Sequence, residues 1–268
     1  MPERAQTSPI ESDEVFADGN MTAVVRRGNE VRRGRTPWAG TSHAVLRHLE
    51  AVGIPWSPRY LGADGGIDRY SFVPGETAPA DLAGYRDDAI LVEVGQMIRA
   101  YHDAMVSFTP PSGVSWPVMP GMPPSDGTIC HNDIAPWNVV FQDGSVSGLI
   151  DWDLVAPATR AWDLAYAAWR FAPLYPAETF GSVADRIRRV HLLLDAYGMT
   201  ANDRADFPEI IIARMRSAFD VVEQWGAVDV PGFDRLYRGR MHVDALDHIA
   251  WTETEFRRVW YEKTAAFQ

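Results

Sequence analysis

The sequence predicts an α+β protein in which a smaller, β-rich N-terminal part precedes a larger, mostly helical part. Three observations support this prediction. Up to about residue 73, short runs of β-forming residues alternate with turns that contain Gly, Asn or Asp. Beyond residue 88, long segments repeat apolar residues at intervals of three and four, which is the spacing of one helix face. Inside the helical part, residues 139–150 have the pattern of a tight β-hairpin.

The composition is typical of a globular protein, with 268 residues of which 46% are hydrophobic and 23% charged. No apolar run approaches the ~20 residues needed to span a bilayer. Residues 1–14 are polar, lack the apolar core of a secretion signal and are expected to be partly disordered. The single cysteine, Cys130, excludes an internal disulfide. We therefore expect a cytoplasmic protein with no membrane partner.

The net charge of −11 bears on the kind of partner. An acidic chain disfavours nucleic acid, because the phosphate backbone needs basic residues. The same charge could attract a cationic substrate. Five acidic residues of the C-terminal helices are candidates to hold such a substrate: Glu223, Asp229, Asp234, Asp244 and Asp247.

Four strands are expected in the N-terminal part. Gly28-Asn29 forms the turn between the first two, and Asp64-Gly65-Gly66 lies between the second two. The expected strands cover residues 21–26, 30–33, 59–61 and 69–73. The turn of residues 18–22, just before them, holds a single glycine.

A helix is expected at residues 41–52, between the two pairs of strands. Apolar residues recur at positions 45, 49 and 52, Thr41 or Ser42 is placed to cap the helix, and Gly53 to end it.

The helical part begins with residues 89–105 and continues, after a proline-rich connection at 107–127, into the hairpin. Asp163 is expected to cap a helix that runs to Phe171. A capping box of Ser182 and Asp185 opens the next helix. Residues 204–226 and 233–263 are expected to form two more helices.

The hairpin brings three oxygen-bearing side chains together. Its two apolar runs are 139–141 and 146–150, and Asp143-Gly144 between them is a strong turn signal. Asp151, after the second run, therefore returns close to Asn138, just before the first. Asp133 lies directly upstream. Carboxylate and amide oxygens are the ligands that Mg²⁺ takes when it also holds phosphate.

The order of these residues matches the phosphoryl-transfer template. The segments His131-Asn132-Asp133-x4-Asn138, Ile150-Asp151-Trp152-Asp153 and Trp162-Asp163-Leu164-Ala165 resemble the aminoglycoside phosphotransferase and choline kinase-like family. The resemblance implies a bilobal protein-kinase-like fold. Residues 15–73 would form the nucleotide-binding lobe and residues 74–268 the catalytic and acceptor-binding lobe.

The resemblance also implies the roles of individual residues. Asp133 would orient and deprotonate the acceptor, while Asn138 and Asp151 would hold Mg²⁺. Arg32, with Arg33 as the alternative, stands where the family has a phosphate-binding lysine. The role of Asp153 is less defined. The implied reaction moves the γ-phosphoryl group of ATP or GTP to a hydroxyl of a small molecule.

Three further positions complete the expected site. Residues 71–76 resemble the hinge between the lobes, where the backbone of Ser71 and Val73 would contact the adenine edge. His131 is expected to orient the catalytic loop through hydrogen bonds, and Asp163 to brace that loop.

Several alternatives stay open. An aminoglycoside, choline, a sugar, homoserine or another metabolite could be the acceptor. The helix at 41–52 lacks the family's early glutamate, since Glu50 comes too late. The missing glutamate, the arginine in place of lysine and the glycine-poor turn support an alternative, a nucleotide-binding protein of weak catalytic activity. A protein kinase is disfavoured, because no segment ending in Ala-Pro-Glu follows Asp151.

Overall fold

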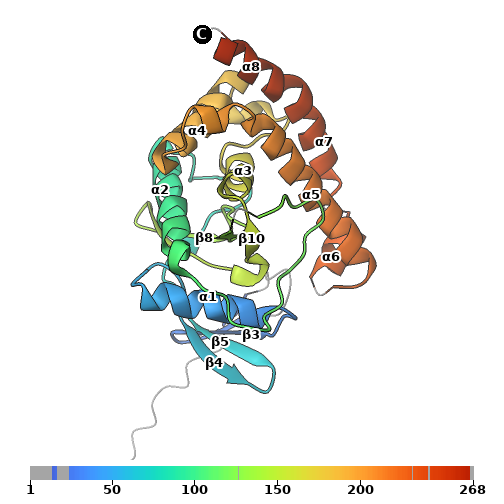
Figure 1. Ribbon diagram of the computed structural model, residues 1–268. Coiled ribbons are helices and arrows are strands. Elements are labelled where there is room, and N and C mark those ends of the chain that lie inside the picture. Colours follow the sequence, from blue (N-terminus) through green and yellow to red (C-terminus); the bar gives the residue numbers. More distant parts are fainter. Residues whose placement is uncertain (1–13, 17–23, 126, 231, 241, 266–268) are drawn as a thin grey trace, which may run out of the picture.

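The computed structural model describes residues 14–16, 24–125, 127–230, 232–240 and 242–265. In these ranges the chain forms a β-sheet N-terminal part and a helical C-terminal part (Figure 1), which confirms the predicted α+β class. The turn expected at residues 18–22 lies outside the described residues, as does all of the expected disordered segment 1–14 except Glu14.

The N-terminal part is a five-stranded antiparallel sheet with the order β1-β2-β3-β5-β4. Both predicted turns lie where expected, with Gly28-Asn29 between β2 and β3 and Gly65-Gly66 between β4 and β5. The strands are β1 (Glu14–Phe16), β2 (Val24–Arg27), β3 (Glu30–Gly34), β4 (Tyr60–Asp64) and β5 (Ile67–Ser71).

Helix α1 (Ala39–Ala51) lies between this sheet and the helical part (Figure 1). Its end was predicted correctly, because Gly53 adopts φ +82° and lets the Ile54 N–H bond the Leu49 carbonyl. Its start was not. The helix begins after Trp38 without a side-chain cap, and residues 41 and 42 are buried within it. Their hydroxyls form tertiary hydrogen bonds instead.

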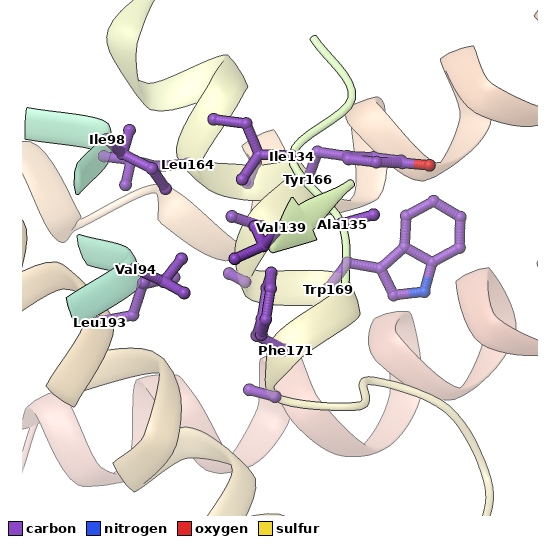
Figure 2. Packing of buried hydrophobic residues seen from close by; sticks show 14 of the residues in the cluster. Val94, Ile98, Ile134, Ala135, Val139, Leu164, Tyr166, Trp169, Phe171 and Leu193 are labelled. Carbon is purple, nitrogen blue, oxygen red and sulfur yellow. The ribbon is translucent and has the colours of Figure 1, made fainter. Parts of the chain in front are cut away.

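The helical part is built around one main core, with two smaller clusters of buried residues beside it. Val94 and Ile98 of α2 and Leu193 of α4 pack toward Val139, with Leu164 of α3 beside them (Figure 2). The helices are α2 (Asp88–Ala104), α3 (Arg160–Phe171), α4 (Val183–Tyr197), α5 (Phe207–Ala227), α6 (Phe233–Arg238), α7 (Asp244–Trp251) and α8 (Arg257–Ala265). None of the helices in the described ranges has the length and apolar character needed to cross a membrane.

The prediction of one helix over residues 233–263 was wrong. The chain breaks after α6, where Gly239 ends the helix and Arg240 adopts a left-handed φ of +54°. Residues 252–256, between α7 and α8, form a π-helical segment. Apolar periodicity does not report such a break, because the flanking helices bury faces of similar character.

Two small antiparallel sheets frame the predicted site. One has the order β6-β8-β9, and in the other β7 pairs with β10. Asp143 and Gly144 form the expected turn of the hairpin, with φ of +52° and +82°. The strands are β6 (Glu76–Thr77), β7 (Thr128–Cys130), β8 (Val139–Gln142), β9 (Ser145–Leu149) and β10 (Ala156–Ala158).

The chain passes from the sheet to the helical part through Pro74-Gly75. Gly75 has φ +132°, and a Cβ there would collide with the carbonyl oxygen of Phe141, so only glycine fits this approach. By Glu76 the chain is already paired with β8. The lobe boundary at residue 73 agrees with this geometry and stays a proposal.

Candidate active site

The catalytic loop, residues 131–138, joins Asp133 and Asn138 directly. Asn138 Nδ2 donates to the backbone oxygen of Asp133 at 2.8 Å and to its Oδ2 at 2.8 Å. The amide oxygen of Asn138, Oδ1, has no hydrogen-bond partner among the described residues. It therefore remains available as a ligand while the amide nitrogen orients the carboxylate.

Asp151 lies beside this loop because the hairpin returns the chain. The Ile150 N–H donates to the Asn138 carbonyl at 2.8 Å, so the first and last residues of the hairpin are in contact. Asp151 itself adopts a left-handed backbone, with φ +61° and ψ +68°. Asp and Asn tolerate that conformation better than most residues. The sequence prediction that Asp133, Asn138 and Asp151 converge agrees with this geometry.

Arg33, and not Arg32, faces these carboxylates. Arg33 Nη1 lies 3.1 Å from Asp151 Oδ1, and its other terminal nitrogen forms an ion pair with Asp153. Arg32 points to the opposite face of β3 and pairs with Glu30 at 2.6 Å. Successive side chains of a strand alternate between faces, so only one of the two arginines can reach the site.

Asp153, whose role the sequence left undefined, is thus part of the same charge cluster. It is buried at 5% exposure. Burial raises the pKa of its carboxyl, Arg33 opposes the shift, and the charge of Asp151 adds to it. Since arginine stays charged in proteins, Arg33 is the fixed cation that holds the two carboxylates together.

His131 ties the loop to the hairpin. Its Nδ1 accepts from the Asp133 N–H at 3.3 Å, and its Nε2 lies 3.1 Å from the Ile150 carbonyl oxygen. A carbonyl only accepts, so Nε2 carries the proton and the ring is neutral. Burial lowers the pKa of His131, which keeps it neutral. The predicted orienting role agrees with these contacts.

Asp163 supports the backbone of the catalytic loop. Its carboxylate accepts from the His131 N–H at 2.9 Å, the Asn132 N–H at 2.8 Å and His102 Nε2 at 3.1 Å. Although burial raises the pKa of Asp163, these hydrogen bonds outweigh it and hold the pKa below its usual value. The bracing role agrees with the prediction, but Asp163 does not cap its helix. Thr159 does, by accepting from the Trp162 N–H.

The second residue of the loop motif has a conformational reason to be Asn. Asn132 has φ +65°, which Asn and Gly adopt more readily than other residues. Its Nδ2 donates to the carbonyls of Cys130 at 3.2 Å and Leu154 at 3.0 Å. The side chain therefore also joins the catalytic loop to the segment that follows Asp151.

The cluster of His102, Cys130 and Asp163 is a hydrogen-bonded support and not a metal site. Its ligand atoms lie within 4.8 Å of one another. The three donors to Asp163 already occupy that carboxylate, however, and His102 Nδ1 lies 3.0 Å from the Tyr197 hydroxyl.

Helix α1 is held without the family's glutamate. Ser42 Oγ donates to the Trp152 carbonyl at 2.8 Å. His43 Nε2 lies 2.9 Å from the buried carboxylate of Asp68 on β5, which also accepts from Arg35 at 2.9 Å. The helix is thus anchored both to the sheet and to the segment around Asp151. From the sequence, Ser42 was predicted only as a possible helix cap, and Asp68 was given no role.

Asp133 has an unusual electrostatic environment. Burial, and then the charge of Asp151, raise its pKa to about 7, against a hydrogen bond from Tyr166 and the charges of Arg214 and Arg170. Arg214 is itself buried and donates to the Asn132 carbonyl at 2.6 Å. A carboxyl with a pKa near neutrality is suited to accepting a proton during a reaction.

The hinge residues differ in what they offer a nucleotide. The Ser71 N–H donates to the Arg59 carbonyl at 2.9 Å, and its hydroxyl accepts from the Arg59 N–H at 2.8 Å. The backbone of Val73 makes no hydrogen bond to other described backbone groups. Val73 can therefore present its N–H and C=O groups to a base edge, whereas the amide of Ser71 is already used.

Three of the acidic candidates of the C-terminal helices pair with neighbouring basic side chains. Glu223 lies 2.7 Å from His242 Nε2, and Asp229 and Asp234 both pair with Arg238. The other two, Asp244 and Asp247, are exposed at the start of α7. These contacts are made within the C-terminal helices themselves.

The donor set fits a magnesium ion. Asn138 Oδ1 and the carboxylate of Asp151 are hard oxygen ligands, and a carboxylate already paired with Arg33 shows that the position attracts a cation.

Comparison with known proteins identifies the family. The model of the phosphotransferase enzyme family matches residues 114–198, the segment with the catalytic loop, the hairpin and α3. The trifolitoxin immunity protein of Rhizobium leguminosarum bv. trifolii is 36% identical over 212 residues, or 75% of this chain and 80% of that protein. The chain belongs to the phosphotransferase enzyme family. It is therefore an enzyme of the phosphotransferase class.

Other similarities are more distant or shorter. A homoserine kinase of Gluconacetobacter diazotrophicus is 31% identical over 129 residues, which is 47% of this chain and 38% of that enzyme. The structure of an amicoumacin kinase in complex with AMP-PNP, Ca²⁺ and Ami has a TM-score of 0.66 at 13% identity, covering 94% of this chain and 92% of that one. Aminoglycoside phosphotransferases and choline/ethanolamine kinases share the fold as well. The predicted family and protein-kinase-like fold are confirmed.

Proposed function

We propose that this phosphotransferase moves the γ-phosphoryl group of ATP, or of GTP, to a hydroxyl of a small molecule. The observation that carries the proposal is the convergence of Asp133, Asn138 and Asp151, with Asn138 donating to the Asp133 carboxylate and Arg33 beside Asp151. The reaction takes place in the cytoplasm, where nucleoside triphosphates and Mg²⁺ are available.

In the proposed reaction Asp133 accepts the proton of the acceptor hydroxyl. The hydroxyl oxygen forms a bond to the γ-phosphorus, the bond from that phosphorus to the β–γ bridging oxygen breaks, and ADP or GDP leaves with the electron pair. Asn138 and Asp151 would hold Mg²⁺, which supplies charge neutralisation for the phosphates when it is bound. This chemistry depends mainly on positioning and charge. The catalytic loop therefore contributes chiefly by holding Asp133 and Asn138 in fixed positions.

Arg33 takes the role of the family's lysine in this proposal. It lies at the carboxylates, so it can grip a phosphate with two donors once Mg²⁺ occupies Asp151. Arg32, the first choice from the sequence, is engaged with Glu30 on the other face. Val73 would present its backbone to the base, with Ser71 lining the same segment.

Calorimetric titration with ATP and GTP, with and without Mg²⁺, tests the nucleotide site. We expect wild-type protein to bind one of them in a Mg²⁺-dependent manner. Asp151→Asn, which suits the left-handed backbone, should weaken that binding at least tenfold and remove its metal dependence. Asp143→Asn is the matched control, because it also has a positive φ, +52°, but lies in the hairpin turn. Unchanged Mg²⁺-dependent affinity in Asp151→Asn would contradict the proposed ligand.

The two neighbouring arginines give a second test. We expect Arg33→Met to raise the KM for Mg-nucleotide at least tenfold, because it removes the only arginine of β3 that faces Asp151. Arg32→Met, one residue away, should change that KM less than twofold. Steady-state kinetics with varied nucleotide would measure both. The reverse order of effects would assign the phosphate contact to Arg32 and reject Arg33.

A second candidate for the acceptor is a toxin or antibiotic. It is favoured by the similarity to an immunity protein across 80% of that protein and by the fold shared with an amicoumacin kinase. Phosphorylation of a hydroxyl on such a molecule would protect the cell by the same chemistry. Mass spectrometry of a toxin or antibiotic panel after incubation with enzyme and Mg-ATP would show a gain of one phosphoryl group.

A further inference from the structure

Arg170 contacts the catalytic loop and has no counter-ion within contact distance among the described residues. Arg170, in the last turn of α3, lies over the ring of Trp169 at 3.6 Å, with the rings of Tyr166 at 5.1 Å and Trp137 at 5.2 Å. Trp137 belongs to the catalytic loop, between Asp133 and Asn138. We call Trp137, Tyr166, Trp169 and Arg170 the Arg170 cluster.

Tyr166 and Trp169 are buried members of the apolar core, Trp137 packs against that core, and the half-buried Arg170 lies at its edge. Figure 2 shows Tyr166 and Trp169 projecting together past Ala135, away from the side on which Val94 and Leu193 pack. Tyr166 also donates to Asp133. The cluster is therefore continuous with the group that takes the acceptor proton.

Within the described ranges, the Arg170 guanidinium has neither an ion pair nor a hydrogen bond. Its Nε is buried with no partner. Arg186 and Arg214 also have a buried Nε without a partner, but their terminal nitrogens donate to backbone carbonyls. Three other arginines of the helical part form ion pairs: Arg160 with Asp103, Arg189 with Asp88, and Arg204 with Asp195. A partly buried cation without a partner is costly, and a ligand anion would remove that cost.

The charge of Arg170 acts on both Asp133 and His248. The charges of Arg214 and Arg170 both lower the pKa of Asp133 against the effect of burial. His248, which accepts from the Trp169 indole N–H at 3.2 Å, has its pKa lowered to about 4 by burial and then by Arg170. Of the acidic candidates of the C-terminal helices, Asp247 acts on His248 and opposes this shift, while Glu223, Asp229 and Asp234 pair with His242 and Arg238.

We propose that the acceptor carries a carboxylate, which Arg170 binds while the acceptor hydroxyl reaches Asp133. This inference rests on the proposed phosphotransferase function and names the chemical class of its acceptor, a hydroxy acid. The planar guanidinium is suited to a carboxylate because two parallel N–H groups can donate to its two oxygens. Stacking on Trp169 fixes the plane of that fork.

Ligand-observed NMR would test the preference without requiring turnover. The probes are 3-hydroxypropionate, 4-hydroxybutyrate and 5-hydroxypentanoate, each paired with its neutral amide, on protein loaded with Mg²⁺ and a non-hydrolysable ATP analogue. We expect at least one carboxylate to bind wild type tenfold more tightly than its amide. In Arg170→Gln the two should differ less than twofold. Arg99→Gln, an exposed arginine on α2, is the control that should keep the wild-type preference.

The outcomes separate the two proposals. Equal binding of every acid and its amide to wild type, or a preference that survives in Arg170→Gln, overturns the carboxylate assignment while nucleotide binding persists. Failure of wild type to bind nucleotide would instead reject the phosphotransferase site. If Arg170→Gln does not fold, Arg170→Lys carries the test. It keeps the charge but loses the paired donors, and an undiminished preference there would overturn the proposal.

Discussion

Replacing Asp133 by Asn is expected to abolish most turnover while leaving nucleotide binding intact. The carboxylate is the proposed acceptor of the hydroxyl proton, and loss of such a group costs about 10²–10⁴-fold in rate. Asn138 and Asp151, the proposed metal ligands, remain in place. The kcat with a hydroxyl acceptor should therefore fall by that factor, and the Kd for Mg-nucleotide should change less than threefold.

The same substitution is expected to stabilise the fold at alkaline pH. The pKa of Asp133 is raised to about 7 in the folded protein, so folding disfavours its charged form. A raised folded-state pKa contributes stability that is complete below the unfolded pKa of about 4 and is lost as the pH rises through about 7. Asn carries no charge and escapes this loss. The gain in unfolding free energy of Asp133→Asn should be about 2 kcal/mol larger at pH 8 than at pH 5.

Urea unfolding at the two pH values would measure this difference. Asp64→Asn, an exposed acid on β4, is the control and should show no pH-dependent gain. A variant that lost turnover but gained no stability at pH 8 would show that Asp133 is ordinarily ionised in the free enzyme. Loss of turnover together with a gain in stability at pH 8 would show that the Asp133 carboxylate serves catalysis at a cost to the stability of the fold.

The central part of the site was predictable because its geometry is local. A two-residue turn and two short apolar strands are enough to return Asp151 to Asn138, and the turn residues Asp143 and Gly144 specify that hairpin by themselves. Asp133 lies five residues before Asn138, so the loop could not carry it far.

The choice between the neighbouring arginines depended on which face of β3 meets the helical part. Alternation separates Arg32 from Arg33 but does not orient the sheet. A usable signal was present: Glu30 lies two residues before Arg32 and therefore on the same face, where the two pair at 2.6 Å. An arginine with a local partner is the less available of the two.

The remaining parts of the site are tertiary and carried no local signal. Asp68 meets His43 across 25 positions, and Arg214 reaches the Asn132 carbonyl across 82. Arg170 was missed although its aromatic neighbours Tyr166 and Trp169 are close in the sequence. Aromatic and basic residues in a helix ordinarily have a structural role, so this pattern did not indicate a binding residue. Only the folded protein shows that this cation has aromatic neighbours and, in the part of the chain that the structure describes, no carboxylate in contact.

Replacing Asp163 by Ala is expected to be the most destabilising single change in the helical part. Its carboxylate has no exposed surface and accepts two backbone N–H groups and the His102 ring. Alanine would leave all three donors buried without an acceptor. Each orphaned donor costs about 1–3 kcal/mol, so we expect a loss of about 3–5 kcal/mol in unfolding free energy.

The damage should extend to the site, because two of those donors are the backbone of the loop before Asp133. Without Asp163 the left-handed backbone of Asn132, at φ +65°, keeps only the hydrogen bonds of its own side chain and the one from Arg214. Denaturant unfolding would measure the loss of stability. Asp206→Ala is the matched control, since Asp206 also lies at the start of a long helix but is exposed and forms no capping hydrogen bond. It should cost less than about 0.5 kcal/mol.

A small effect of Asp163→Ala would mean that water or a rearranged His102 replaces the lost acceptor, and the loop would then be held chiefly by His131 and Arg214. A large effect, with turnover lost even where the protein remains folded, would show that one buried carboxylate sets the position of Asp133. In that case the support under the catalytic loop would be as necessary for phosphoryl transfer as the residues that touch the substrates.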